Sequence, residues 1–281
     1  MAIVVPSIFA DATNAAMEHN LRIGKIAFDA TDMVGDIREC GDTVHFPTID
    51  RISDAEVMEK GQDLTPSELS MTDSEAKIKQ VGKAVRIYDK DSRQVKGNVV
   101  DKLAEQIGET MANAVDTDLV TEMDNSAVYK TATTGTTTIT YEEVEGGFDV
   151  FGDDVADSSY AGIVINSRLR SAFLAFPQFT KADYTYSKEN NGIAGEDGVI
   201  GYWHGLIPVI VCNNNTYDTD KKECKTYIVK KNALGIIWQK EASVEEERES
   251  LKKATILSAD ELYAVKLLNT KGVSILRKTV A

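Results

Sequence analysis

Four glycines that could form a ligand-binding loop stand at every third position: Gly192, Gly195, Gly198 and Gly201. A phosphate-binding P-loop ends in Gly-Lys-Ser/Thr, because its lysine must reach the phosphates and its hydroxyl must reach magnesium. Here a tyrosine follows the last glycine. A dinucleotide-binding turn lies between a strand and a helix, whereas the run "IPVIV" after these glycines is typical of a strand. We therefore interpret the glycines as an architectural loop rather than a ligand site.

Residues suited to catalysis or metal binding are few and scattered. No two histidines lie within ten residues of each other, and none has the spacing of a zinc site: they are His19, His45 and His204. The sequence has no GxSxG nucleophile elbow, and adjacent acids such as Asp153 and Asp154 are common in a chain with 45 acidic residues. The stretch "DTDKKE" at 218–223 lacks the glycine and the distant glutamate of a calcium loop, so it predicts a hairpin tip. We expect no catalytic residue, no cofactor and no metal ligand.

The composition is that of an ordinary globular protein, with 281 residues, 42% hydrophobic and 27% charged. The net charge of −14 disfavours nucleic-acid binding through phosphate contacts, which need clustered Lys and Arg. No apolar run approaches the roughly 18 residues of a membrane span, and the N-terminus lacks the pattern of a secretory signal. We expect folding in the cytosol, no membrane partner, and three buried, unpaired cysteines at Cys40, Cys212 and Cys224.

Residues 92–125 carry the strongest helix signal, because they lack proline and place a large apolar residue at every fourth position. These residues are Val95, Val99, Leu103, Ile107, Met111, Val115, Leu119 and Met123. A helix turns about 100° per residue, so the stripe drifts by about 40° per step and about 280° overall. We therefore expect a helix about 50 Å long whose two ends contact different neighbours.

The segments before this helix predict an arm and a two-stranded excursion. Residues 1–40 contain short helical pieces with too few large apolar residues for a self-sufficient helix, so we expect them to gain most of their burial outside the chain, from other subunits. In the next segment, Val44 and Phe46 alternate inward in one strand. One face of a second predicted strand carries Val81, Lys83, Val85 and Ile87. The long polar connection between the strands is too long for a simple hairpin turn.

Charge is polarised within this excursion. Residues 51–75 carry seven acids against two bases, and residues 77–96 carry seven bases against two acids. Such segments can pair within one chain or between chains, or they can remain two solvated faces. The candidate inter-subunit contacts are Lys77, Lys79, Lys83, Arg86, Asp54, Glu56, Glu59 and Asp63.

The second half predicts an α+β arrangement of helices on a small sheet. Thr140 and Glu143 form a capping box for a short helix, with Ile139 and Val144 as the apolar staple. A buried strand at 161–165 is followed by a helix capped by Asn166 or Ser167 and ended by Pro177. Further strands follow in "LIPVIVC", "KTYIVK" and "ALGIIWQ".

The C-terminus predicts a closing hairpin of "ELYAVKLL" and "VSILRK" joined by "NTKG". Gly272 would occupy a left-handed position in the turn. The preceding run "EASVEEERES" carries five glutamates and one arginine, which is typical of a solvated face.

The order of these elements and several local strings resemble the major capsid proteins of tailed bacteriophages with the HK97-like fold, nearest to the N4-type group. "AGIVINSRLRSAFLAF" resembles the strand and short helix of the family's axial domain. "GVIGYWHGLIPVIVCNNN" resembles its G-x-x-x-G-x-P-V-x-V passage, and "SADELYAVKLLNTKGVSILRK" resembles its peripheral-domain strands. The resemblance spans essentially the whole chain.

The resemblance implies an α+β HK97-like capsid fold divided into an N-terminal arm (1–40), an extended loop across a neighbouring subunit (41–90), the spine helix with part of the peripheral domain (91–136), an axial domain (137–228) and the peripheral C-terminal strands (229–281). It implies self-assembly into hexamers and pentamers around double-stranded DNA, with scaffold and portal proteins as further partners. It implies assembly in the host bacterial cytoplasm and residence in the virion capsid. The four glycines would then lie in a loop near the symmetry axis, followed by buried residues at 207–211.

Two alternatives remain open from the sequence. An encapsulin-like nanocompartment shares the architecture but encloses cargo proteins instead of DNA. A soluble α+β enzyme or binding domain would instead be a stable monomer that forms neither rings nor shells.

Overall fold

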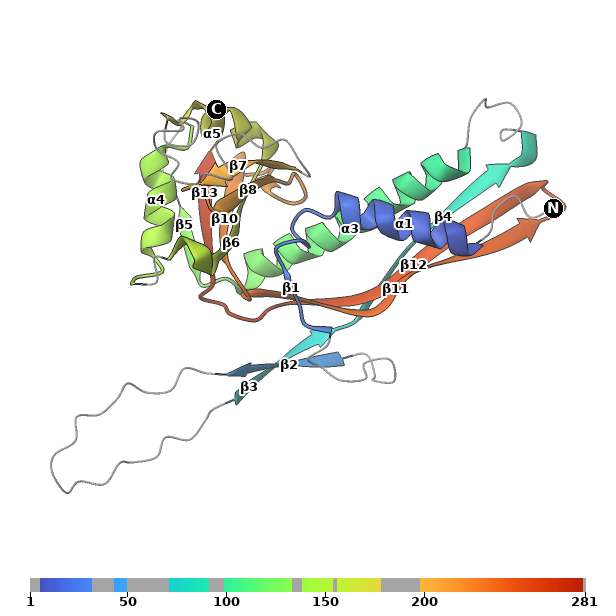
Figure 1. Ribbon diagram of the computed structural model, residues 1–281, viewed down its shortest axis with the longest axis horizontal. Coiled ribbons are helices and arrows are strands. Elements are labelled where there is room, and N and C mark those ends of the chain that lie inside the picture. Colours follow the sequence, from blue (N-terminus) through green and yellow to red (C-terminus); the bar gives the residue numbers. More distant parts are fainter. Residues whose placement is uncertain are drawn as a thin grey trace, which may run out of the picture.

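The computed structural model describes residues 6–31, 43–49, 71–90, 99–132, 138–153, 156–177 and 198–279. It is a mixed α+β fold in which a compact module at one end is joined to an elongated module (Figure 1). The long helix α3 (Val99–Ser126) runs from the elongated module to the compact one. Its 28 residues span about 42 Å.

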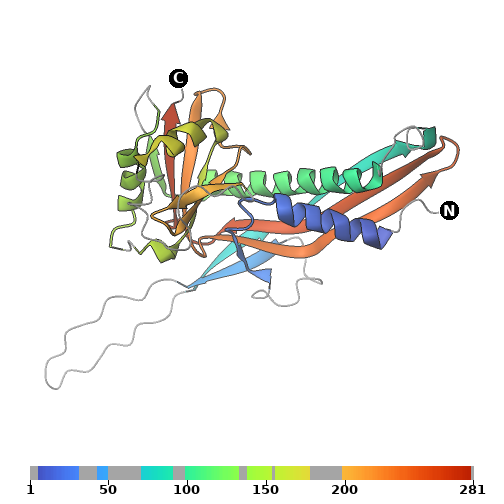
Figure 2. The same cartoon turned by 45° about the horizontal axis from the view of Figure 1, so that its top comes forward.

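The elongated module is a four-stranded sheet with two helices on one face. The strands follow the order β1 (Phe28–Asp29), β11 (Leu234–Glu249), β12 (Ala254–Leu267) and β4 (Lys79–Tyr88). β1 runs parallel to β11, and the other neighbours are antiparallel. Helix α1 (Pro6–Asn20) packs on β11 and α3, and α3 packs on β12 and β4 (Figure 2).

The compact module is a seven-stranded mixed sheet in the order β5-β13-β10-β6-β8-β7, with β9 beside β10. The bounds are β5 Tyr129–Ala132, β13 Val273–Thr279, β10 Glu223–Lys230, β6 Tyr160–Ile165, β8 Ile207–Val211, β7 Val199–Trp203 and β9 Tyr217–Asp218. Helices α4 (Tyr141–Asp149) and α5 (Arg170–Ala175) bury Val144, Phe148 and Phe173 in a core shared with this sheet. Short 3-10 turns at Asp157–Ser159 (η3) and Ser167–Leu169 (η4) flank β6.

A separate antiparallel pair, β2 (Thr43–Ile49) and β3 (Met71–Lys77), projects from the elongated module (Figure 1). Val44 and Phe46 are buried against Ile237 and Ala264, which confirms the predicted inward alternation. Ala264 lies next to Tyr263 in β12, and successive strand residues point to opposite faces. The pair therefore packs on the sheet face opposite α3.

The predicted long helix is confirmed over 99–126, while residues 92–98 lie outside the described part of the chain. Its two ends do contact different neighbours. Near one end, Gly108 lies against Thr13 of α1. Near the other, the Asp124 carboxylate accepts a hydrogen bond from Tyr227 of β10 at 3.0 Å.

Several local predictions in the second half are also confirmed. The Glu143 carboxylate accepts the Thr140 backbone N–H at 2.8 Å, and Ile139 and Val144 are both buried beside this cap. The Asn166 side chain caps the turn that leads into α5. Cys212 and Cys224 are free and buried, and Cys40 lies outside the described residues. The hairpin tip predicted at 218–223 is confirmed, since this stretch joins the antiparallel strands β9 and β10.

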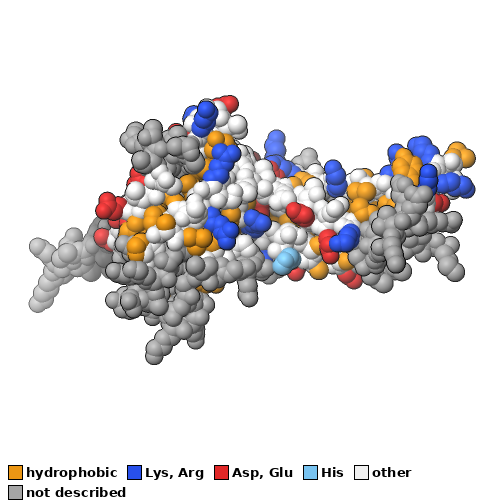
Figure 3. Space-filling model, turned by 90° about the horizontal axis from the view of Figure 1, so that it is seen from above, with side chains coloured by type: hydrophobic (Ala, Val, Ile, Leu, Met, Phe, Trp, Pro, Cys, Tyr) orange, Lys and Arg blue, Asp and Glu red, His pale blue; other side chains and the backbone are white. Residues whose placement is uncertain are grey.

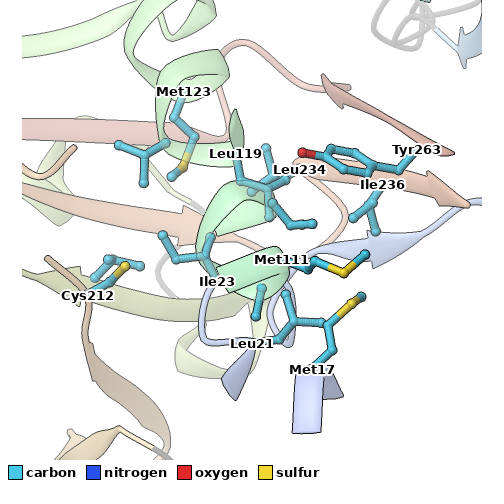
Figure 4. Packing of buried hydrophobic residues seen from close by; sticks show 14 of the residues in the cluster. Met17, Leu21, Ile23, Met111, Leu119, Met123, Cys212, Leu234, Ile236 and Tyr263 are labelled. Atoms are coloured by element: carbon cyan, nitrogen blue, oxygen red, sulfur yellow. The ribbon is translucent and has the colours of Figure 1, made fainter. Parts of the chain in front are cut away.

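The expectation that residues 1–40 find their burial outside the chain is wrong for residues 6–31. Phe9, Met17 and Leu21 are buried in the largest core cluster. Figure 4 shows Met17, Leu21 and Ile23 packed around Met111 and Leu119 of α3. The apolar residues of α1 are few, but a four-residue spacing from Phe9 through Thr13 to Met17 places them on one face.

The predicted closing hairpin is also wrong. β12 pairs with β11 and β4 in the elongated module, whereas β13 pairs with β10 and β5 in the compact module. Gly272 does not have a positive φ; instead a β-carbon there would lie 2.6 Å from the Ala233 β-carbon. The glycine is therefore required by close packing at a corner between two sheets.

The glutamate-rich run forms part of a strand and keeps the solvated face that the sequence predicts. β11 continues through it to Glu249 and pairs with β12 along its length. Ala242 and Val244 are buried, while Glu245 and Glu247 are exposed. The apolar pair anchors the strand to the sheet, and the acids remain in water on its outer side.

The glycine loop is partly a strand. Gly201 is buried in β7 opposite Val209, and Gly198 directly precedes this strand with φ +82°. Gly192 and Gly195 lie outside the described residues. The prediction that Ile207–Val211 is buried is confirmed, since Ile207 and Val209 are fully enclosed. The loop prediction failed at Gly201 because pairing with β8 supplies its backbone hydrogen bonds.

Candidate functional site

The predicted contact bases lie along one edge of the elongated module. Lys77 ends β3, and Lys79, Lys83 and Arg86 follow on β4, an edge strand of the four-stranded sheet. The predicted acidic partners lie outside the described residues: Asp54, Glu56, Glu59 and Asp63.

Two of these bases have acidic partners within the chain. Lys79 Nζ lies 2.9 Å from Asp118 Oδ1 on α3, and Arg86 Nη2 lies 3.1 Å from Glu249 Oε1 on β11. Lys77 and Lys83 are exposed and form no ion pair with a described residue. The structure thus separates the set into two bases that serve the fold and two that remain available at the surface.

A cluster around His204 has the residue types of an active site. The His204 ring lies 3.0 Å from Glu145 through Nε2 and 3.2 Å from Asp157 through Nδ1. Trp203 Nε1 donates a hydrogen bond to Glu145 at 3.0 Å, and the Tyr141 ring stacks on Trp203 at 5.1 Å between centroids. The cluster joins the β7–β8 turn to α4 and η3.

The electrostatics of this cluster favour a structural role. The hydrogen bond with Glu145 raises the pKa of His204 above its ordinary value, partial burial opposes the rise, and Asp157 adds to it. Burial and the Glu145 carboxylate raise the pKa of Tyr141 to about 12. Because a carboxylate engages each ring nitrogen, neither nitrogen is available as a base or a metal ligand. His204 therefore holds the turn, in which its own φ is +50° and that of Gly205 is +74°.

Asp116 of α3 anchors the N-terminal segment. Its carboxylate accepts the backbone N–H groups of Arg22 at 3.1 Å, Ile23 at 3.0 Å and Gly24 at 3.1 Å. Burial raises the pKa of Asp116, although these hydrogen bonds act in the opposite direction. Arg22 in turn donates to the Val211 carbonyl of β8 at 2.7 Å. The segment after α1 thus connects α3 to the compact module.

Acids further along α3 bind both sheets. Asp118 accepts a hydrogen bond from Tyr263 of β12 at 2.8 Å, and Asp124 pairs with Lys225 of β10. The helix is therefore fixed at one point to the elongated module and at another to the compact module. No sequence motif identified these acids, because their partners lie far away in the chain.

Large apolar side chains are exposed at two turns. Leu251, in the turn between β11 and β12, is 100% exposed, and Lys252 and Lys253 follow it. Figure 3 shows apolar and basic side chains gathered at this end of the elongated module. Leu206, in the turn held by His204, is 58% exposed. Both ends of the molecule therefore present apolar groups at the surface.

Across the described ranges, no group of three His, Cys, Asp or Glu residues is placed to hold a metal ion. Within the same part of the chain, no helix combines the length and the apolar character needed to span a bilayer.

Several solved structures share this architecture. A chain from the capsid of cyanophage P-SCSP1u superposes with a TM-score of 0.65 at 12% identity, covering 92% of this chain and 88% of that one. A chain from the capsid of a native GTA particle gives 0.65 at 12% identity, covering 93% and 91%. A chain of Mycobacterium phage Che8 gives 0.61 at 16% identity, covering 90% and 89%. These likenesses show a shared fold.

Sequence comparison agrees with this. The major capsid protein of Staphylococcus phage phiMR11 is 25% identical over 280 residues, which cover 97% of this chain and 93% of that protein. Residues 72–275 match the family model described as "Phage capsid protein". Since the matched segment is most of the molecule, from β3 to β13, this chain belongs to the phage capsid protein family.

Proposed function

We propose that this chain is a major capsid protein of the HK97-like type, nearest to the N4-type group, and that it assembles into hexamers and pentamers around double-stranded DNA. The observation that carries the proposal is the architecture: one long helix fixes a compact module to an elongated module, and a two-stranded excursion projects from their side. A subunit of this shape can contact several neighbours at once. Its role is structural rather than catalytic.

In this proposal the compact module is the axial domain and the elongated module is the peripheral domain, with α3 as the spine. Residues 1–40 and 41–90 remain the proposed arm and extended loop. We propose the domain boundaries expected from the sequence with β5 and β13 assigned to the axial domain, because both strands belong to the compact module's sheet. Scaffold and portal proteins, and assembly in the host cytoplasm, are parts of the same proposal.

The charge of the chain supports a container for DNA. A net charge of −14 gives a subunit that repels phosphate overall, so the packaged DNA would stay mobile. The enclosed DNA would be bound without sequence preference. An inner shell surface found to be strongly basic would contradict this part of the proposal.

The contents of purified particles test the function. Particles from infected or induced cells would be treated with nuclease, opened, and analysed for protected DNA and for co-purifying proteins. Double-stranded DNA inside the shell supports the capsid proposal. Shells that contain a cargo protein and no DNA support the encapsulin-like alternative, and a stable monomer at high concentration supports the soluble-domain alternative.

A further inference from the structure

The β11–β12 ribbon of the elongated module is irregular at one place. Trp238 is opposite Tyr263 and Ser243 is opposite Asp260, so five steps along β11 match three along β12. β11 therefore carries two extra residues in this stretch. Bulges of this kind bend a strand and increase its twist, and Figure 1 shows the ribbon curving where it passes β1.

Glu261 of β12 lies at this irregularity. It is opposite Val81 of β4 but has no register partner on β11. It shares its strand face with Ala259 and Tyr263, which belong to the core cluster beneath α3. Its side chain is 0% exposed, and neither carboxylate oxygen has a hydrogen-bond partner among the described residues. A bare carboxylate in such a site strongly favours its neutral form.

The charged groups on the neighbouring strands are engaged or directed elsewhere. Lys79 and Lys83 flank Val81 on β4, but Lys79 pairs with Asp118 and Lys83 is exposed. On β11, Lys240 pairs with Asp260, which points to the opposite face of β12 from Glu261.

The helices above Glu261 do not neutralise it either. On α3, Asp116 binds the backbone of residues 22–24, and Asp118 binds Lys79 and Tyr263. On α1, the titratable residues are all exposed: Asp11, Glu18 and His19. In agreement with this environment, burial raises the pKa of Glu261 to about 7.

We propose that Glu261 and the bulged stretch of β11, which carries the two extra residues between Trp238 and Ser243, form a protonation-coupled hinge in the elongated module. The neutral carboxyl is compatible with the bent ribbon packed under α3. When Glu261 releases its proton to water, the ionised carboxylate favours a conformer in which this stretch opens and the ribbon changes its bend relative to the helix. The bulges localise the change, because the register there is already interrupted. The inference concerns the single chain and does not depend on shell assembly.

Hydrogen–deuterium exchange of the full chain between pH 6 and 8.5, corrected for intrinsic exchange rates, tests the hinge. In the wild-type protein, protection of peptides covering 238–243 and 258–263 should fall about tenfold across this range. The opening equilibrium shifts up to tenfold per pH unit between the pKa of the exposed carboxyl and the higher pKa of the buried one, and it levels off above the latter. The variants E261Q and E261M, which cannot ionise, should keep their protection. The matched control E245Q, at an exposed glutamate of β11, should behave like the wild-type protein.

Constant protection of the wild-type peptides across this range would overturn the proposal without any variant. So would an equal loss of protection in E261Q or E261M, since the loss would then not depend on the carboxyl. E261M keeps the test available if a buried amide at E261Q prevents folding. Loss of protection spread evenly over both modules would also contradict a local hinge.

Discussion

Gly108 of α3 and Thr13 of α1 are in backbone contact, because a β-carbon at Gly108 would lie 2.7 Å from the Thr13 carbonyl oxygen. The same carbon would lie 2.9 Å from the Met17 backbone nitrogen. These backbone atoms cannot move aside without shifting α1. The absence of a side chain at this position therefore allows the two helices to pack closely over the sheet.

We expect Gly108→Ala to lower the free energy of unfolding by about 2 kcal/mol, although alanine is the better helix former. Gly146→Ala in α4 is the matched control, since nothing lies within 4 Å of a β-carbon there. That variant should be neutral or more stable by about 0.5–1 kcal/mol. Chemical denaturation of both variants checks the pair, and equal effects would contradict the close contact.

The anchor at Asp116 predicts a large loss on truncation. Asp116→Ala leaves three backbone N–H groups without their acceptor in a buried site, so we expect destabilisation of about 3 kcal/mol. Asp116→Asn keeps one oxygen and should lose about half as much. Glu109→Ala, at an exposed position of the same helix, should change stability by less than about 0.5 kcal/mol. If urea unfolding gave Glu109→Ala and Asp116→Ala the same loss in the free energy of unfolding, Asp116 would not be the anchor of the N-terminal segment.

The ion pairs of His204 with Glu145 and Asp157, which hold the β7–β8 turn, predict a pH dependence with a definite sign. Because the folded-state pKa of His204 is raised, its stabilising contribution is complete below pH 6.5 and is lost as the pH rises through the folded-state value. His204→Gln should therefore lower Tm more at pH 6 than at pH 9, by roughly 2 °C after allowance for solvent screening. Gln106→Ala, at an exposed position of α3 whose side chain does not titrate, should show no such difference. A Tm loss that is the same at both pH values would argue against a stabilising contribution from charged His204.

The bases on and beside β4 predict two separable effects. Lys77→Glu with Lys83→Glu should leave folding intact and impair assembly, because both side chains are exposed. Lys79→Glu should instead destabilise the subunit by about 1 kcal/mol, since it places a second acid beside Asp118. Circular dichroism and sedimentation measure the two properties. Normal particles from the double variant would show that these lysines are not contacts.

Elements defined by neighbouring residues could be predicted from the sequence. The apolar spacing of α3 and the cap formed by Thr140 and Glu143 involve residues within one or two turns of each other. Pairing between distant segments could not be predicted in the same way. "NTKG" has the local composition of a turn, but the requirement for Gly272 comes from Ala233 on another strand.

Two further features could not be predicted from the sequence for related reasons. The alternation in β11 is interrupted by its extra residues, so the sequence does not show that the strand extends through the acidic run to Glu249. Asp116 carries no motif, because its three partners lie more than 90 residues away in the sequence. Of the candidate contact residues, only the four bases could be placed, and two of them serve the fold.

We propose that this chain is a shell-forming subunit, and electron microscopy of the full chain, expressed alone or with a scaffold protein and concentrated, would reveal this directly. We expect rings of five or six subunits and closed shells whose density accommodates the compact module near the symmetry axes. Fields that contain only single subunits at every concentration, with or without scaffold, would contradict it.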